Sequence, residues 1–146
     1  MAQTKRRASA TWSGSLKEGT GSLSATGGVL NSTPFSFKTR FQSEDGSAGT
    51  NPEELIAAAH AGCFTMATGA TMGQQGIIPT SLETKAVLTM DTDTLTITTI
   101  DLVLTGSVPG IDQAKFEEIA NDAKKNCIIS RALSPDITLT LTATLV

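Results

Sequence analysis

NPEELIAAAHAGCF, residues 51–64, contains the strongest helix-start signal in this chain of 146 residues. Asn51 is a favoured N-cap residue, and Pro52 suits the first helical position, where its missing N–H loses no hydrogen bond. The two glutamates that follow place negative charge at the positive end of the helix dipole. Glu54 also stands three residues after Asn51, which is the spacing of a capping-box exchange. We therefore predict a helix from here to the glycines at 73–76.

Alternation of apolar and polar residues predicts β-strands on both sides of this helix. Phe35, Phe37 and Phe41 alternate with polar residues, which predicts a half-buried strand with Arg40 on its opposite face. The apolar phase shifts within residues 97–100, which indicates a β-bulge. The expected strands cover residues 9–14, 20–25, 35–42, 81–90, 95–106 and 137–145.

A second main helix is predicted after the Pro-Gly turn at 109–110. Asp112 is its expected N-cap, and Phe116 begins an apolar stripe that reaches Cys127 near the helix end. The sequence thus predicts an α+β fold of antiparallel sheets with two main helices. We expect one domain over residues 1–146, with residues 1–8 as a flexible N-terminal tail.

Composition and charge argue against several classes of function. The net charge is −3, and the only basic cluster, at residues 5–7, is expected to be a solvated tail rather than a nucleic-acid contact. The longest apolar run falls below a membrane span and no signal peptide is recognised, so we expect a cytoplasmic protein. Thiols there are kept reduced, so a disulfide would be transient. Two cysteines and one histidine also argue against a zinc site.

The two cysteines, Cys63 and Cys127, are the candidate reactive groups. A catalytic cysteine acts as thiolate and needs a positive or hydrogen-bond-donating environment. His60 lies one helical turn before Cys63, Arg40 is a permanent cation, and Glu53 could orient that arginine through a bidentate hydrogen bond. Each residue also has a purely structural interpretation: a histidine bonded to a backbone carbonyl, a solvated arginine, a dipole-compensating glutamate and inert apolar cysteines.

Residues 50–56 and 58–64 closely resemble the signature of the OsmC/Ohr family of organic hydroperoxide reductases. His60 and the glutamate pair at positions 53 and 54 resemble the OsmC branch of this family. Ile128 departs from the pattern, because many members have proline after the second cysteine. The resemblance continues through residues 28–31, 39–41, 79–81, 108–112 and 126–127.

This resemblance implies a thiol peroxidase that reduces organic hydroperoxides, and hydrogen peroxide more weakly, in oxidative or osmotic stress defence. Cys63 would be the attacking thiolate that becomes a sulfenic acid, and Cys127 the resolving thiol that forms a disulfide with it. Arg40 would stabilise the thiolate, and Glu53 would hold Arg40. The family uses a dihydrolipoyl-type dithiol as reductant and requires no metal, flavin or haem. Its fold is an intertwined homodimer.

Helix geometry independently favours the dimer. Glu53 and Cys63 are ten residues apart, a rise of roughly 15 Å on one unbroken helix, which is too far for one arginine to contact both comfortably. Either the first turn departs from the helix axis, or Arg40 and Glu53 reach the cysteine from a partner chain. We expect the second arrangement, which would give two equivalent sites in a C₂ dimer.

Two other functions remain open at this stage. Cys63 and His60 could form a nucleophile–base dyad for hydrolysis or acyl transfer, although a mid-helix pair offers no free N–H groups for an oxyanion. The chain could also be a non-catalytic, stress-associated binding module on the same fold. The first alternative leaves Cys127 without a role, and the second predicts an unreactive Cys63.

Overall fold

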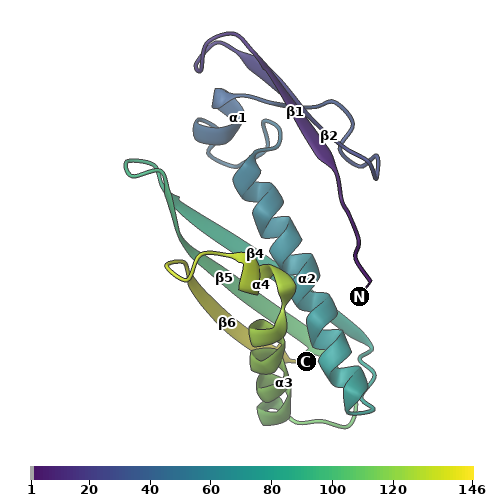
Figure 1. The fold of residues 1–146 in the computed structure, drawn as a ribbon. Helices are drawn as coiled ribbons and strands as arrows, with labels where there is room; N and C mark the ends of the chain where they lie inside the picture. The colour runs from purple at the N-terminus through teal and green to yellow at the C-terminus, as the bar shows by residue number, and fades with distance from the viewer. Residues whose placement is uncertain (1) are drawn as a thin grey trace. The chain divides into compact units, whose positions relative to one another are not determined.

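A computed structural model describes residues 2–146 as an α+β protein (Figure 1). The chain forms two compact units, the first ending at Leu55 and the second spanning Ile56–Val146. The first unit contains β1 (Ala8–Ser13), β2 (Thr20–Ala25), β3 (Thr33–Phe35), α1 (Phe37–Phe41) and the start of α2 (Pro52–Gln74). The second contains the rest of α2, β4 (Ser81–Asp91), β5 (Thr96–Ser107), α3 (Gln113–Asn126), α4 (Ile128–Ala132) and β6 (Thr138–Leu145).

The first unit is built on an antiparallel sheet in the order β1-β2-β3. The strands predicted at 9–14 and 20–25 are confirmed, each within one residue at either end. Residues 2–7 form no helix or strand, but the expected tail over residues 1–8 extends one residue too far. The carbonyl of Arg7 already accepts a hydrogen bond from the N–H of Thr26, and Ala8 belongs to β1.

The predicted strand over residues 35–42 is wrong beyond Phe35, because the chain turns there into the short helix α1. Ser36 and Thr39 form a capping box: the Ser36 hydroxyl accepts from the Thr39 N–H at 3.2 Å, and the Thr39 hydroxyl from the Ser36 N–H at 2.9 Å. Phe37 and Phe41 then stand one turn apart, with ring centroids separated by 5.0 Å. The hydrogen bonds of the Ser36–Thr39 capping box therefore decide the local structure, although the alternation of apolar and polar residues favours a strand.

The start of α2 follows the prediction in all but one contact. The Asn51 side-chain oxygen accepts from the N–H of Glu54 at 2.8 Å, as expected of an N-cap. Glu54 does not complete the capping box, because its carboxylate accepts from the hydroxyl of Thr50 instead. The helix ends at Gln74, and Gly76 beyond it adopts a φ of 71°, which suits glycine.

The second unit contains a sheet in the order β4-β5-β6. β4 and β5 are antiparallel, with the predicted bulge: Thr89 pairs with Thr99 and Met90 with Ile97, so Thr98 has no partner. β6 runs parallel to β5, against the expectation of wholly antiparallel sheets. The reason is that α3 and α4 lie between β5 and β6 in the sequence. They carry the chain back to the end of the sheet where β5 begins, as a parallel crossover requires.

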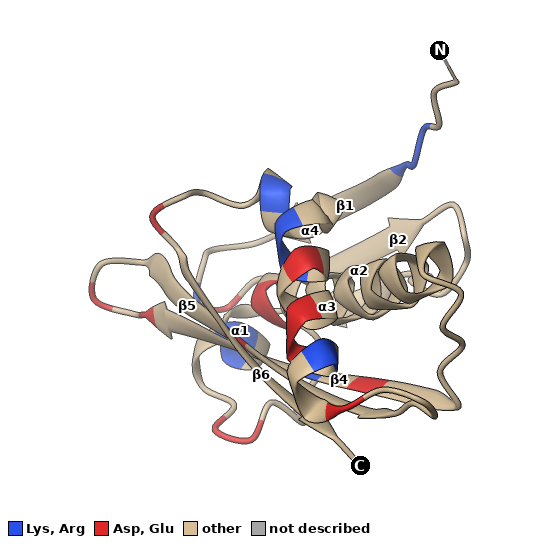
Figure 2. Cartoon of the chain, turned by 90° about the horizontal axis from the view of Figure 1, so that it is seen from below, with Lys and Arg blue, Asp and Glu red and all other residues tan. Residues whose placement is uncertain are grey.

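One face of this sheet is covered by α2 and α3, which Figures 1 and 2 both show on the same side. Asp112 caps α3 by accepting from the N–H of Lys115 at 2.8 Å, as predicted. Gly106 of β5 has no room for a side chain, because the ring of Phe116 lies against it. The buried core contains Phe64, Met72, Ile100, Leu102, Leu104, Val108, Phe116, Ile119, Ala120, Ala123 and Cys127.

Helix α2 is also long and apolar enough, by length and composition alone, to cross a membrane. This qualifies the expectation drawn from the longest apolar run, because the alanines and larger apolar residues of α2 give a high mean hydropathy although His60, glycines and threonines interrupt the run. A single helix of this kind is weak evidence for a membrane span, since core helices of globular proteins meet the same criterion. Beyond its first turn α2 carries no Asp, Glu, Lys or Arg, whereas α3 carries both signs of charge (Figure 2).

Candidate functional site

The two cysteines line one cavity of about 770 Å³ in the second unit. Cys63 lies in the middle of α2, and Cys127 lies at the junction where α3 ends and α4 begins. Both are free thiols; Cys127 is buried and Cys63 is partly exposed. The cavity is lined by Ala59, Cys63, Met66, Ala67, Ala70, Thr71, Gln74, Asn126, Cys127, Ile128 and Ile129. The walls are thus mostly apolar, and the reactive groups they present are the two sulfur atoms.

The two thiols differ in acidity. Burial raises the pKa of Cys63 above its ordinary value, and the neighbouring Cys127 adds to this rise. Burial opposes ionisation of Cys127 as well, but the nearby polar groups of Ser130, the Cys63 thiol and the N–H of Ile129 together outweigh it, so the pKa of Cys127 is lowered. Within the second unit alone, Cys127 is therefore the more acidic of the two thiols.

His60 is fully buried one turn before Cys63 but hydrogen-bonds elsewhere. Its Nε2 lies 2.7 Å from the hydroxyl of Ser130 on α4, while Nδ1 has no hydrogen-bond partner within residues 2–146. Burial lowers the pKa of His60, so the ring is neutral near pH 7. The partner is a side-chain hydroxyl rather than the backbone carbonyl considered from sequence. The Cys63–His60 dyad required for hydrolysis is not formed among the described residues.

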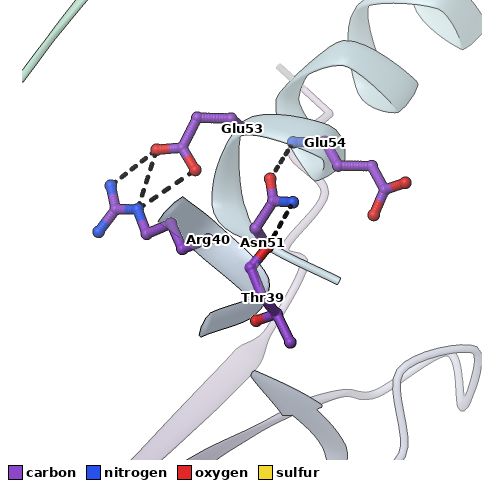
Figure 3. A network of polar contacts seen from close by, with 5 residues as sticks. All are labelled: Thr39, Arg40, Asn51, Glu53 and Glu54. Carbon is purple, nitrogen blue, oxygen red and sulfur yellow. Dashed lines mark hydrogen bonds and ion pairs between the residues drawn. The ribbon is translucent and has the colours of Figure 1, made fainter. Parts of the chain in front are cut away.

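Arg40 and Glu53 form an ion pair in the first unit (Figure 3). The Nη2 of Arg40 donates to Oε1 of Glu53 at 2.7 Å, and its Nε donates to both carboxylate oxygens at 3.1 and 3.2 Å. The Glu53 side chain is 13% exposed and that of Arg40 40% exposed. The carboxylate thus fixes one side of the guanidinium and leaves Nη1 free of this contact. The predicted orientation of Arg40 by Glu53 is confirmed in the structure.

Asn51 joins the two helices that present this ion pair. Besides capping α2, its side-chain Nδ2 donates to the carbonyl of Thr39 at 3.4 Å (Figure 3). Arg40 follows Thr39 in α1 and Glu53 lies in the first turn of α2, so one amide side chain fixes both backbones. The guanidinium also lies over the ring of Phe41, 5.0 Å from its centroid.

The four predicted site residues therefore form two pairs, one in each unit: Cys63 with Cys127, and Arg40 with Glu53. Ser130 was not predicted from sequence, because it lies 70 residues from His60 and belongs to no recognised motif. The one available signal was its position three residues after Cys127. Among residues 2–146, no three His, Cys, Asp or Glu side chains gather closely enough to hold a metal ion.

An α+β fold that brings two free cysteines to one apolar cavity defines the chain as a two-cysteine thiol protein. The model of the OsmC-like protein family matches residues 44–142, and the chain belongs to this family. It is 45% identical over 136 residues to Peroxiredoxin OsmC of Escherichia coli, covering 92% of this chain and 93% of that relative. The same identity and coverage are found for Peroxiredoxin OsmC of Shigella flexneri.

Solved structures agree with this fold. The organic hydroperoxide resistance protein OhrB of Bacillus subtilis superposes with a TM-score of 0.64 at 26% identity, over 94% of this chain and 98% of that one. An organic hydroperoxide resistance protein OsmC from Legionella pneumophila gives a TM-score of 0.73 at 21% identity, over 99% of each chain. The predicted α+β, OsmC-like fold is confirmed, apart from the parallel pairing of β5 and β6.

Proposed function

We propose that Cys63 and Cys127 carry the peroxidase activity of this OsmC-family protein. Relatives at 45% identity are named peroxiredoxins, and neighbours of the same fold are named organic hydroperoxide resistance proteins. The observation that carries the assignment of residues is the cavity shared by the two free thiols. Its mostly apolar walls suit a hydroperoxide with an alkyl or aryl tail.

The reaction begins when the Cys63 thiolate attacks one oxygen of the hydroperoxide. The O–O bond breaks, the sulfur is oxidised to sulfenic acid, and the departing alkoxide takes a proton and leaves as the alcohol. The Cys127 thiolate then attacks the Cys63 sulfur, and the S–O bond breaks as a disulfide forms. The hydroxide takes a proton and leaves as water. An external dithiol restores both thiols by two exchange steps and is itself oxidised to a disulfide.

Arg40 supplies the positive charge that this first step needs. Burial disfavours the Cys63 thiolate, so an additional cation is required to bring its pKa down. Glu53 holds the guanidinium through two of its nitrogens, which leaves Nη1 to face a thiolate or a peroxide oxygen. No metal or organic cofactor enters this scheme.

A homodimer provides the route by which Arg40 reaches Cys63. Helix α2 is continuous from Pro52 to Gln74, which supports the view that Glu53 and Cys63 of one chain are too far apart to share an arginine. Met66 and Ile128, both lining the cavity, are 78% and 73% exposed, so apolar surface beside the thiols is available to a partner chain. The partner would contribute Arg40 and Glu53 to each cavity.

Mixed dimers test this exchange directly. A Cys63→Ser chain retains Arg40, and an Arg40→Gln chain retains Cys63, so neither has a complete site alone. If the arginine comes from the partner, refolding equal amounts together restores one complete site in each heterodimer, up to about a quarter of wild-type activity. If the arginine comes from the same chain, the mixture stays as inactive as its components.

The reductant is expected to be a dithiol of the dihydrolipoyl type, and the expected location is the cytoplasm, where such dithiols stay reduced. The test of function is consumption of cumene hydroperoxide with dihydrolipoamide as electron donor. Cys63→Ser is expected to reduce turnover to the uncatalysed rate. Cys127→Ser is expected to keep the first oxidation and to accumulate a sulfenic acid at Cys63. An unchanged rate in Cys63→Ser would contradict the proposal and favour a non-catalytic binding module.

A further inference from the structure

We propose that a second cavity, beside Arg40 in the first unit, is a binding site for an aromatic ring, and that it holds the aryl group of a hydroperoxide whose oxygens lie against the guanidinium. This aromatic cavity has a volume of about 300 Å³. The proposal rests on the peroxidase function and the role of Arg40 proposed above, and it names a substrate class for them. The residues that line the cavity include Arg40, Leu16 and four aromatic residues, Trp12, Phe35, Phe37 and Phe41.

The aromatic residues of the chain are divided between a core and this cavity. The chain has five phenylalanines and one tryptophan. Phe64 and Phe116 are fully buried in the core of the second unit, as large apolar rings ordinarily are. The other four line the aromatic cavity and none of them is buried; Trp12 is 40% exposed. The rings of the first unit therefore enclose a space and leave apolar surface for a ligand.

A glycine of β2 brings two of these rings together. Trp12 in β1 and Phe35 in β3 both pair with Gly21, one on each side of it. Residues two strands apart are separated by roughly 10 Å, yet the two ring centroids are 5.5 Å apart. A Cβ at Gly21 would lie 2.6 Å from Cε1 of Phe35, so only glycine leaves room for this approach. The missing side chain shapes one wall of the cavity.

The indole of Trp12 is held in place from its own turn. Its Nε1 donates to the carbonyl of Gly14 at 3.1 Å, and a Cβ at Gly19 would lie 2.9 Å from its Cε2. The only polar group of the indole is thus satisfied, and the ring offers the cavity an apolar surface. Phe37 and Phe41 of α1 form another part of the wall, with their rings tilted by 47°. Tilted contacts of this kind are what a further aromatic ring prefers.

The volume of the cavity suits a substituted benzene ring. An apolar cavity of about 150 Å³ is enough to hold benzene in a protein interior. The aromatic cavity, at about 300 Å³, therefore has room for a phenyl group and a few further carbon atoms. Cumene hydroperoxide has this shape, because its phenyl ring is bonded to the carbon that carries the peroxide.

Arg40 specifies the polar end of the ligand. It is the charged residue among those that line the cavity, and its guanidinium lies over the ring of Phe41, 5.0 Å from the centroid. Glu53 accepts from Nε and Nη2, and Nη1 takes no part in this ion pair. A guanidinium nitrogen donates and cannot accept, so the group beside it must be an acceptor such as a peroxide or alcohol oxygen. The chain that contributes Arg40 to a site thus contributes the ring-binding cavity as well.

The fluorescence of Trp12 provides a direct binding assay, because it is the only tryptophan in the chain. The wild-type protein is titrated with 2-phenylpropan-2-ol, the unreactive alcohol that forms from cumene hydroperoxide. We expect a saturable change in the emission of Trp12. tert-Butanol has the same hydroxyl group without the ring, and it is expected to bind about tenfold more weakly or worse.

Two cavity variants have matched controls. Gly21→Ala places a methyl group against the ring of Phe35, whereas a Cβ at Gly27 meets no atom within 4 Å, so Gly27→Ala is its control. Leu16→Ala removes a lining side chain, and Leu95→Ala is its control, since both leucines are 68% exposed. We expect each cavity variant to weaken alcohol binding about three- to tenfold. The ratio of kcat/KM for cumene hydroperoxide over tert-butyl hydroperoxide should fall by the same factor, and both controls should keep wild-type values.

Several outcomes would overturn the proposal. One is a Trp12 emission that does not respond to the alcohol up to its solubility, which is also the result if a side chain of a second copy fills the cavity. Another is a wild-type kcat/KM ratio in Leu16→Ala; this exposed position keeps the test available if Gly21→Ala does not fold. Either result leaves the peroxidase assignment intact when Cys63→Ser has lost turnover. Wild-type turnover in Cys63→Ser would remove the peroxidase assignment and this proposal together, whatever the emission shows.

Discussion

The region around the sulfur atoms and the region around Arg40 are built in opposite ways. Cys63 and Cys127 line an apolar cavity, and burial raises the pKa of Cys63. Arg40 and Glu53 are joined by an ion pair with three hydrogen-bond contacts, and the Arg40 side chain is 40% exposed. The first region has the nucleophile without a cation, and the second has the cation without a nucleophile.

This difference indicates how the chemistry is divided. A hydroperoxide with an apolar tail needs the apolar cavity, but the same cavity makes the attacking thiol a weaker acid. An arginine held by a carboxylate stays partly hydrated and oriented. The local environment lowers the pKa of Cys127 and raises that of Cys63, so the proposed attack by Cys63 calls for a cation from elsewhere.

Removing the positive charge of Arg40 should have the largest effect on the rate of Cys63 oxidation. Arg40→Gln is expected to raise the pKa of Cys63, because an opposite charge close to a thiolate changes its pKa by about 1–3 units. Oxidation of Cys63 at neutral pH should slow about 10- to 1000-fold, while resolution by Cys127 changes much less. Stopped-flow consumption of cumene hydroperoxide measures the oxidation step, and quenched mass spectrometry of the Cys63–Cys127 disulfide measures resolution. Lys38→Gln, which removes a cation of the same helix that forms no ion pair within residues 2–146, is the matched control. Equal slowing of both steps would argue against this role for Arg40.

Weakening the Arg40–Glu53 ion pair should slow Cys63 oxidation less than removing Arg40 does. Glu53→Gln keeps a hydrogen-bond acceptor but loses the charge that holds the guanidinium. We expect oxidation to slow about tenfold, because Arg40 is still present but less well oriented. Glu54→Gln is the control, since this neighbouring carboxylate bonds Thr50 and not Arg40. A larger loss in Glu54→Gln than in Glu53→Gln would show that the anchor has been misassigned.

Two helix caps of equal strength should have unequal kinetic effects. Asn51→Ala and Asp112→Ala each remove one N-cap hydrogen bond and should cost about 1 kcal/mol in the free energy of unfolding. Only Asn51 also holds the carbonyl of Thr39, beside Arg40. We therefore expect slower Cys63 oxidation in Asn51→Ala and a wild-type rate in Asp112→Ala. Thermal unfolding and peroxide consumption together test this. Matching rates in the two variants would mean that Asn51 does not position the ion pair.

The smallest expected effect concerns one exposed turn carboxylate in each unit. The N–H and hydroxyl of Ser47 lower the pKa of Asp45, and the N–H groups of Thr94 and Asp93 lower that of Asp91. A carboxyl whose folded pKa is depressed stabilises the fold above its unfolded pKa, and this contribution is lost as pH falls through the folded pKa. Asp91→Asn and Asp45→Asn should therefore each reduce the loss of Tm on acidification, without affecting peroxidase activity. An unchanged Tm profile in both would contradict this.

Sequence predicted best what depends on local chemistry. The caps at Asn51 and Asp112 and the bulge near Thr98 all follow from residues close together in the chain. The same reasoning failed at Ser36, where alternating phenylalanines indicated a strand but a capping box starts a helix. The two signals compete within six residues, and hydrogen bonds of the cap decide between them.

Features that depend on contacts between distant parts of the chain could not be predicted from the sequence pattern. The parallel pairing of β6 follows from how α3 and α4 return the chain, which an alternating threonine strand does not reveal. The contact of His60 with Ser130 joins two helices across 70 residues. The roles of Cys63 and Cys127 came from the family resemblance, since spacing alone did not place them in one cavity.

The dependence of Cys63 on Arg40 is tested most directly by the pH dependence of thiol alkylation. The rate of reaction of Cys63 with iodoacetamide is measured against pH in a Cys127→Ser background, with and without Arg40→Gln. With Arg40 present, we predict half-maximal reactivity below the ordinary range for a free thiol. Without it, burial alone should move the midpoint above that range. Superimposable profiles for the two proteins would contradict the account.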